Sequence, residues 1–116
     1  MHIHIPFKFK ILHYDWVVRW EPKRGKLEEN DCYGICAHDL RTIYISQTIK
    51  DKPDILLHTI LHELAHAILT TGGYTELSDN EGFVDLISGL ICQIIYTKKD
   101  LKDPTVPKPV KEEKQI

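Results

Sequence analysis

The stretch His62-Glu63-Leu64-Ala65-His66 constrains this chain more than any other. On an α-helix, two histidines four positions apart lie on one face about one turn from each other, so both imidazoles can reach one cation. Glu63 follows the first histidine and is rotated by about 100° around the helix, towards a water bound to that cation. This HExxH arrangement is typical of zinc hydrolases.

The surroundings of the motif favour a metal site over a chance match. With seven histidines in the chain, random shuffling produces HExxH in about 3% of sequences. From Ile55 to Leu69, however, Glu63 is the only formally charged side chain. Burying a lone carboxylate costs several kcal/mol unless it is paired or near a cation, so Glu63 calls for a partner.

Bulk properties predict one globular domain. The chain has 116 residues, of which 42% are hydrophobic and 28% charged, enough for a single modest core. We expect a domain over residues 1–99, followed by an extended or disordered tail over residues 100–116, which is charged and contains three prolines. No stretch resembles a signal peptide or a membrane-spanning helix, which predicts a cytoplasmic protein without a membrane partner. The cysteines are odd in number and predict free thiols: Cys32, Cys36 and Cys92.

Charge is distributed unevenly along the chain. Residues 53–97 contain six carboxylates and no lysine or arginine, whereas the whole chain has a net charge of −2, so the remaining residues carry +4. The acidic segment is the one that contains the HExxH motif. A divalent cation would relieve its repulsion, and the same charge argues against binding of nucleic acid.

The N-terminal half predicts strands. Apolar residues alternate with polar ones over residues 3–11 and again over residues 14–20, the period expected of half-buried strands. Residues 21–30 are charged and turn-rich, which indicates a loop. Cys32 to Ala37 and Thr42 to Ser46 then predict a hairpin, and the whole half predicts an antiparallel sheet. Four histidines of this half are expected at the surface: His2, His4, His13 and His38.

The C-terminal half predicts two helices. Asp51, Pro53 and Asp54 suit the start of the first helix, which carries the motif, and Gly72-Gly73 suits its end. His58 precedes His62 by one turn, too far along the axis for one ion to bind His58 and both motif histidines, so we expect it in the core or in a supporting role.

The second helix is expected from near Ser78 to about Thr97. A stripe of small and acidic residues follows it at helical spacing, and we expect this stripe to pack against the HExxH helix. An alternative is that Ser78 and Glu81 form a capping box and that the stripe faces water. Asp85 is the only charge between Gly82 and Thr97, which is unusual for a wet face. The stripe consists of Glu81, Asp85, Ser88, Gly89 and Cys92.

Four carboxylates compete for the place of a third metal ligand. Glu76 precedes the second helix, and Asp79 suits a helix N-cap. Glu81 and Asp85 share one helix face a turn apart. If Glu81 reaches the metal, Asp85 is therefore placed to accept the outer N–H of a ligating histidine, His62 in preference.

The HELAH motif, followed by Glu81 and then Asp85 in a Glu-x-x-x-Asp arrangement, resembles the gluzincin zinc metallopeptidases. Residues 31–97 look most similar to compact members, the minigluzincins and the ImmA/IrrE-type and phage-encoded metallopeptidases. The resemblance implies an α+β zincin-like domain, with an N-terminal antiparallel sheet, an HExxH helix and a glutamate-bearing second helix. It also implies that His62, His66 and Glu81 hold Zn²⁺ with a water, and that Asp85 supports a histidine.

The expected function is therefore hydrolysis of peptide or protein substrates. Glu63 would act as general base, and Tyr74 is a candidate for stabilising the oxyanion. A strand such as Thr42 to Ser46 could hold an extended peptide by edge pairing. The alternative is a zinc-binding regulatory or interaction module without turnover, such as a phage or toxin–antitoxin component. The oligomeric state is left open by the sequence.

Overall fold

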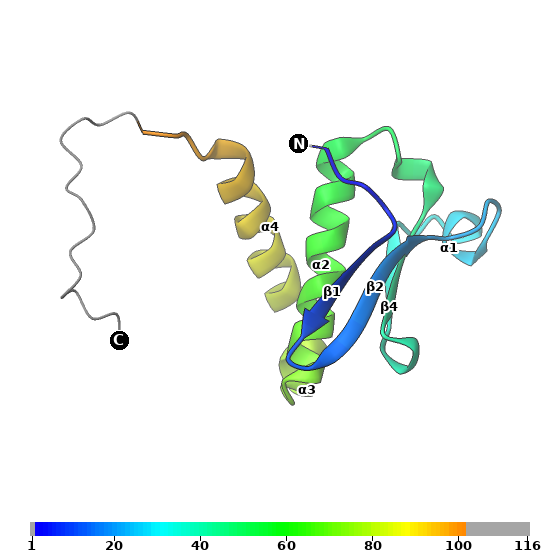
Figure 1. Cartoon of the computed structure of the whole chain (residues 1–116), viewed down its shortest axis with the longest axis horizontal. Coiled ribbons are helices and arrows are strands. Elements are labelled where there is room, and N and C mark those ends of the chain that lie inside the picture. The colour runs from blue at the N-terminus through cyan, green and yellow to red at the C-terminus, as the bar shows by residue number, and fades with distance from the viewer. Residues whose placement is uncertain (1, 102–116) are drawn as a thin grey trace.

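The computed structural model describes residues 2–101, which form an α+β domain in three layers. A four-stranded sheet lies on one side, helix α2 (Pro53–Thr71) lies in the middle, and helix α4 (Glu81–Thr97) lies on the side of α2 that faces away from the sheet (Figure 1). The expectation of a small α+β domain with a sheet and two main helices is confirmed at this level.

The sheet is mixed, so the expectation of a purely antiparallel sheet is wrong. Its strands are β1 (Phe7–Ile11), β2 (Tyr14–Trp20), β3 (Gly34–Ala37) and β4 (Thr42–Ile45), in the order β1-β2-β4-β3. The hairpins β1–β2 and β3–β4 are antiparallel, but β2 and β4 run parallel. The β3–β4 hairpin pairs with β2 through β4, because the side chains of β4 are buried whereas β3 remains half exposed.

The position of β4 also corrects the expectation for a peptide-binding edge. Residues Thr42–Ile45 lie between β2 and β3, so both edges of β4 are already paired. Among the described strands, β3 and β1 are the edges of the sheet. Any added strand next to the HExxH helix would have to pair with β3.

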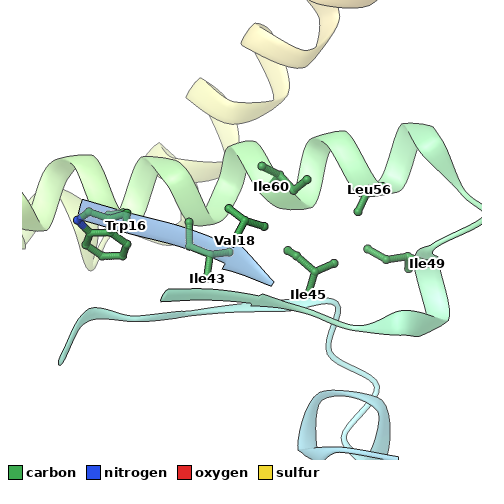
Figure 2. Packing of buried hydrophobic residues seen from close by; sticks show 8 residues of the cluster. Trp16, Val18, Ile43, Ile45, Ile49, Leu56 and Ile60 are labelled. Atoms are coloured by element: carbon green, nitrogen blue, oxygen red, sulfur yellow. The ribbon is translucent and has the colours of Figure 1, made fainter. Parts of the chain in front are cut away.

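The core fills the space between the sheet and α2. Val18, Ile43 and Ile45 are fully buried on the sheet, and Leu56 and Ile60 cover them from α2 (Figure 2). Their branched side chains suit a pleated surface that is covered by a helix. This packing fixes the rotation of α2, because residues four apart on one helix face must all point to the sheet.

The N-terminal residues depart in part from the predicted pattern. Pairing of β1 starts only at Phe7, although Ile3 and Ile5 still pack against the core. The predicted loop over residues 21–30 contains a single helical turn, α1 (Lys26–Glu29). The buried carboxylate of Glu21 accepts a hydrogen bond from the backbone N–H of Leu27 (2.8 Å) and so holds this turn.

The second helix begins later than expected. A short helix, α3 (Thr75–Ser78), comes first, and α4 then starts at Glu81 with Asn80 as its cap, because Asn80 Oδ1 accepts a hydrogen bond from the Phe83 N–H (3.0 Å). Neither Ser78 nor Asp79 caps α4, so the capping-box alternative is wrong. Within residues 2–101, no helix is both long and apolar enough to cross a membrane. The expected tail lies, from residue 102 onward, outside the described residues.

Candidate metal centre

The two histidines of the motif lie side by side in the middle of α2. His62 and His66 are one turn apart, and their Nε2 atoms are separated by 3.3 Å. Both side chains are mostly buried, with 20% and 16% of their surface exposed. The sheet fixes the direction in which the two histidines point, because α2 packs a different face, with Leu56 and Ile60, against the sheet.

Helix α4 brings a carboxylate to the same point. Glu81 Oε1 lies 2.8 Å from His66 Nε2 and 3.6 Å from His62 Nε2. A tetrahedral ion with bonds of about 2.0–2.1 Å separates its ligand atoms by about 3.4 Å. The three atoms observed here form a triangle of that size, so His62, His66 and Glu81 could hold a metal ion.

Each histidine is also held through its outer nitrogen. His62 Nδ1 lies 2.9 Å from Asp85 Oδ1, the contact that the spacing of Glu81 and Asp85 predicts. An Nδ1–H that donates to this carboxylate leaves the Nε2 lone pair directed at the triangle. The predicted stripe of α4 therefore faces α2 at this point.

The partner of His66 is Ser78, for which the sequence suggests a role in a capping box and not at the site. His66 Nδ1 lies 3.2 Å from Ser78 Oγ, which accepts a hydrogen bond from the Thr70 hydroxyl (2.9 Å) and donates one to the His66 carbonyl (3.4 Å). With its own hydrogen used on that carbonyl, the Ser78 hydroxyl can accept from an Nδ1–H of His66. Helical periodicity in the sequence cannot relate Ser78 to His66, because the two residues lie on different helices, α3 and α2, with a turn between them.

Glu63 is buried beside the triangle and does not belong to it. Its side chain lines the same cavity as His62, His66 and Glu81, and only 9% of the residue is exposed. Burial raises the pKa of Glu63 from 4.5 to about 7; nearby His66 opposes this shift and the Glu81 carboxylate adds to it. A carboxyl group with such a pKa can both take up and release a proton near neutral pH.

Strand β3 forms the wall of this cavity, which has a volume of about 310 Å³. Gly34 permits the close approach of β3 to α2, since a Cβ at this position would lie 2.8 Å from Thr59 Cγ2 and 3.2 Å from Glu63 Cγ. A glycine inside a strand pattern is the sequence signal for such an approach. Ile35 and Cys36 complete the wall, and burial raises the pKa of the Cys36 thiol to about 12.

Two other residues, Tyr74 and His58, differ from their expected positions. Tyr74 is 62% exposed and does not line the cavity, because it precedes α3 and projects outward. His38 is exposed, as expected, and it also lines the cavity from the turn after β3. His58 is exposed near Gly89 and takes no part in the triangle, so it is not a core residue.

Comparisons with known proteins give no match to this chain. No family model matches it, and neither a curated protein nor a solved structure was found to be significantly similar. The resemblance to gluzincins therefore stays a prediction from the motif residues.

Proposed function

We propose that the protein is a zinc-dependent metallopeptidase. The observation that carries this proposal is the position of Glu63, a buried carboxyl that lines the same cavity as the three potential ligand atoms. A site that only stored a cation would not need a further, separately held carboxyl beside its ligand atoms.

The donor set suits zinc. Two imidazole nitrogens and one carboxylate are the ligands of a catalytic zinc site that keeps one position open. When bound by His62, His66 and Glu81, zinc would acidify a water molecule and polarise a carbonyl group. Asp85 and Ser78 would hold the two imidazoles in the orientation that directs Nε2 towards the ion.

Glu63 would then transfer the proton of the attacking water. Its carboxylate accepts a proton from the attacking water and passes it to the nitrogen of the leaving amine. Because the side chain is confined between α2 and β3, it stays at the cavity while the substrate changes.

Strand β3 is the element that would hold the substrate. Its outer edge is unpaired among the described strands, and Gly34, Ile35 and Cys36 line the cavity next to Glu63. An extended peptide that pairs with this edge would place its backbone carbonyls over the site. His38, which lies at the end of β3, replaces Tyr74 as the candidate for stabilising the oxyanion.

The test combines metal content with hydrolysis. Purified protein is loaded with zinc and incubated with denatured casein, and Glu63→Gln is compared with the matched change Glu76→Gln at an exposed carboxylate. We expect one zinc per chain in all three proteins, and loss of hydrolysis only in Glu63→Gln. His38→Gln should retain zinc and reduce the rate, whereas Tyr74→Phe should leave it unchanged.

Two results would contradict the proposal. If His62→Ala and His66→Ala each still bind one zinc, the site is elsewhere. If the wild type binds zinc tightly but cleaves no denatured protein, the alternative of a zinc-binding regulatory or interaction module replaces the peptidase.

A further inference from the structure

The outer face of α4, opposite the metal centre, is apolar and exposed. Leu86, Leu90 and Ile94 follow one another at intervals of four residues, so they form one line along the helix. Their exposed fractions are 57%, 47% and 63%. Figure 1 shows this helix as the outermost of the three layers, with α2 on its other side.

The apolar surface continues into the groove between the two helices. A cavity of about 250 Å³ lies there, lined by nine residues of α2 and α4 that are all apolar. Ile68 and Ile91 belong to its lining and are themselves 53% and 41% exposed. With the line on α4, they make one continuous face, which we call the α4 face: Ile68, Leu86, Leu90, Ile91 and Ile94.

This face is large for a monomer. Half-exposed leucine and isoleucine side chains offer roughly 100 Å² each, so five of them offer on the order of 500 Å². That is near the upper limit of the apolar patches on monomeric proteins and covers much of the ~800 Å² that each partner buries in a stable complex. No charged residue lies between Leu86 and Thr97, so a second apolar surface could approach without burying a charge.

We propose that the occupant of the α4 face is α4 of a second copy of this chain, packed antiparallel about a two-fold axis near Leu90. The line of side chains is symmetric about Leu90, because Leu86 and Ile94 lie four residues to either side. In an antiparallel pair, Leu90 therefore meets Leu90 of the second copy, and Leu86 meets Ile94 of the second copy. A two-fold contact requires this kind of self-complementary surface.

Charges at the two ends of α4 favour the antiparallel direction. The exposed Asp79 lies just before its start, and Lys98, Lys99 and Asp100 follow its end with a net charge of +1. Antiparallel packing brings the acidic start of each helix near the basic end of the other, and the helix dipoles also oppose each other favourably. Parallel packing would place like charges together.

The dimer would leave both metal centres accessible. Glu81 and Asp85 lie on the opposite side of α4, towards α2. This proposal therefore does not depend on the metallopeptidase proposal, and either can fail alone.

The first test measures molecular mass in solution. Light scattering on the full chain at micromolar concentration should give about twice the 13.5 kDa of one chain. Leu90→Glu should return the mass to that of one chain, because it places two carboxylates at the axis. Leu12→Glu is the control at another exposed leucine, 71% exposed against 47% for Leu90 and away from the face, and it should remain dimeric. Circular dichroism checks that each variant is folded.

The second test uses disulfide formation to determine which residues of the two α4 helices lie opposite each other. Cys32, Cys36 and Cys92 are first replaced by serine. Leu90→Cys should crosslink to itself under mild oxidation. Leu86→Cys alone should not, whereas the double variant Leu86→Cys/Ile94→Cys should. Self-crosslinking of all three single variants, at positions 86, 90 and 94, would indicate parallel helices and overturn the proposed arrangement.

Several outcomes of the mass measurement would overturn the proposal. One is a monomeric wild type. Another is a Leu90→Glu variant that stays dimeric, because the contact then lies elsewhere. A full chain that is monomeric and becomes dimeric when residues 102–116 are removed would show that this segment occupies the face instead.

Discussion

The two faces of α4 differ in a way that is unusual for a surface helix. The face turned towards α2 carries the buried Val84 and Ser88, and also Glu81 and Asp85, whose side chains are still 65% exposed. The face turned outward is apolar and exposed, with Leu86, Leu90 and Ile94. A helix held only by the hydrophobic effect would bury these apolar residues as well. The carboxylates turned towards α2 belong to the candidate metal site, and the outward apolar residues belong to the proposed dimer contact.

The largest expected effect concerns the inner face. Glu81→Ala removes one of the three potential ligand atoms and should nearly eliminate stoichiometric zinc binding. Asp85→Ala removes only the support of His62 and should weaken zinc affinity by about 10 to 100-fold.

Zinc affinity can be measured by competition with a chromogenic chelator, with Glu76→Ala and Asp79→Ala as controls at exposed carboxylates. A Glu81→Ala variant that holds zinc as tightly as the wild type would show that α4 turns Glu81 and Asp85 towards α2 for another reason.

The next largest effect is the difference in packing between the two faces of α4. Ser88 is fully buried, and its hydroxyl donates to the carbonyl of Val84 (2.8 Å), so Ser88→Leu would force extra volume between the helices. We expect a loss of about 1–3 kcal/mol in the free energy of unfolding.

The reciprocal change, Leu86→Ser on the outer face, should cost less than about 0.5 kcal/mol in the monomer. Urea unfolding at a concentration below that of dimer formation measures both variants. Equal losses for the two would mean that the faces are not distinguished by burial.

The smallest effect tests how closely the inner face approaches α2. A Cβ at Gly89 would meet His58 Nε2 at 3.8 Å, an ordinary contact, so no close approach requires glycine there. Gly89→Ala should therefore raise stability by about 0.5–1 kcal/mol through helix propensity.

Thermal unfolding of this variant can be compared with that of Gly34→Ala, which should lose stability because its Cβ would clash with Thr59. If Gly89→Ala instead lowers the stability, α4 and α2 lie closer together at this position than the 3.8 Å distance to His58 Nε2 indicates.

Helical periodicity accounts for the part of the site that was predictable. His62, Glu63 and His66 lie on one helix, and Glu81 and Asp85 lie on another, so each group is ordered by spacing alone. The scarcity of charged residues on α4 predicted that Glu81 and Asp85 would face the motif residues of α2.

The remaining features depend on turns and on long-range pairing. Ser78 reaches His66 only because α3 interrupts the predicted helix, and the sequence between residues 72 and 80 has no periodicity that shows this. The parallel pairing of β2 with β4 depends on how the second hairpin docks, which alternation cannot indicate because it is the same for either direction. The position of Tyr74 was predicted wrongly for the same reason, since it lies in a turn. His38 is exposed as expected, but its place in the cavity lining depends on the turn after β3 and has no periodic signal.

The local origin of the metal centre has a consequence for how the chain folds. All three potential ligand residues and both side chains that support them come from residues 62–85, whereas β2 and β4 pair across α1 and β3. Glu81 lies 19 residues from His62 and 15 from His66 (81 − 62 and 81 − 66), whereas Val17 pairs with Thr42 across 25 (42 − 17). Closing the shorter loop costs somewhat less entropy, and short-range contacts form sooner. The helical pair can therefore assemble before the sheet is complete. A cation that binds this early pair would speed folding as well as slow unfolding, so that the metal would act as a nucleus for the chain.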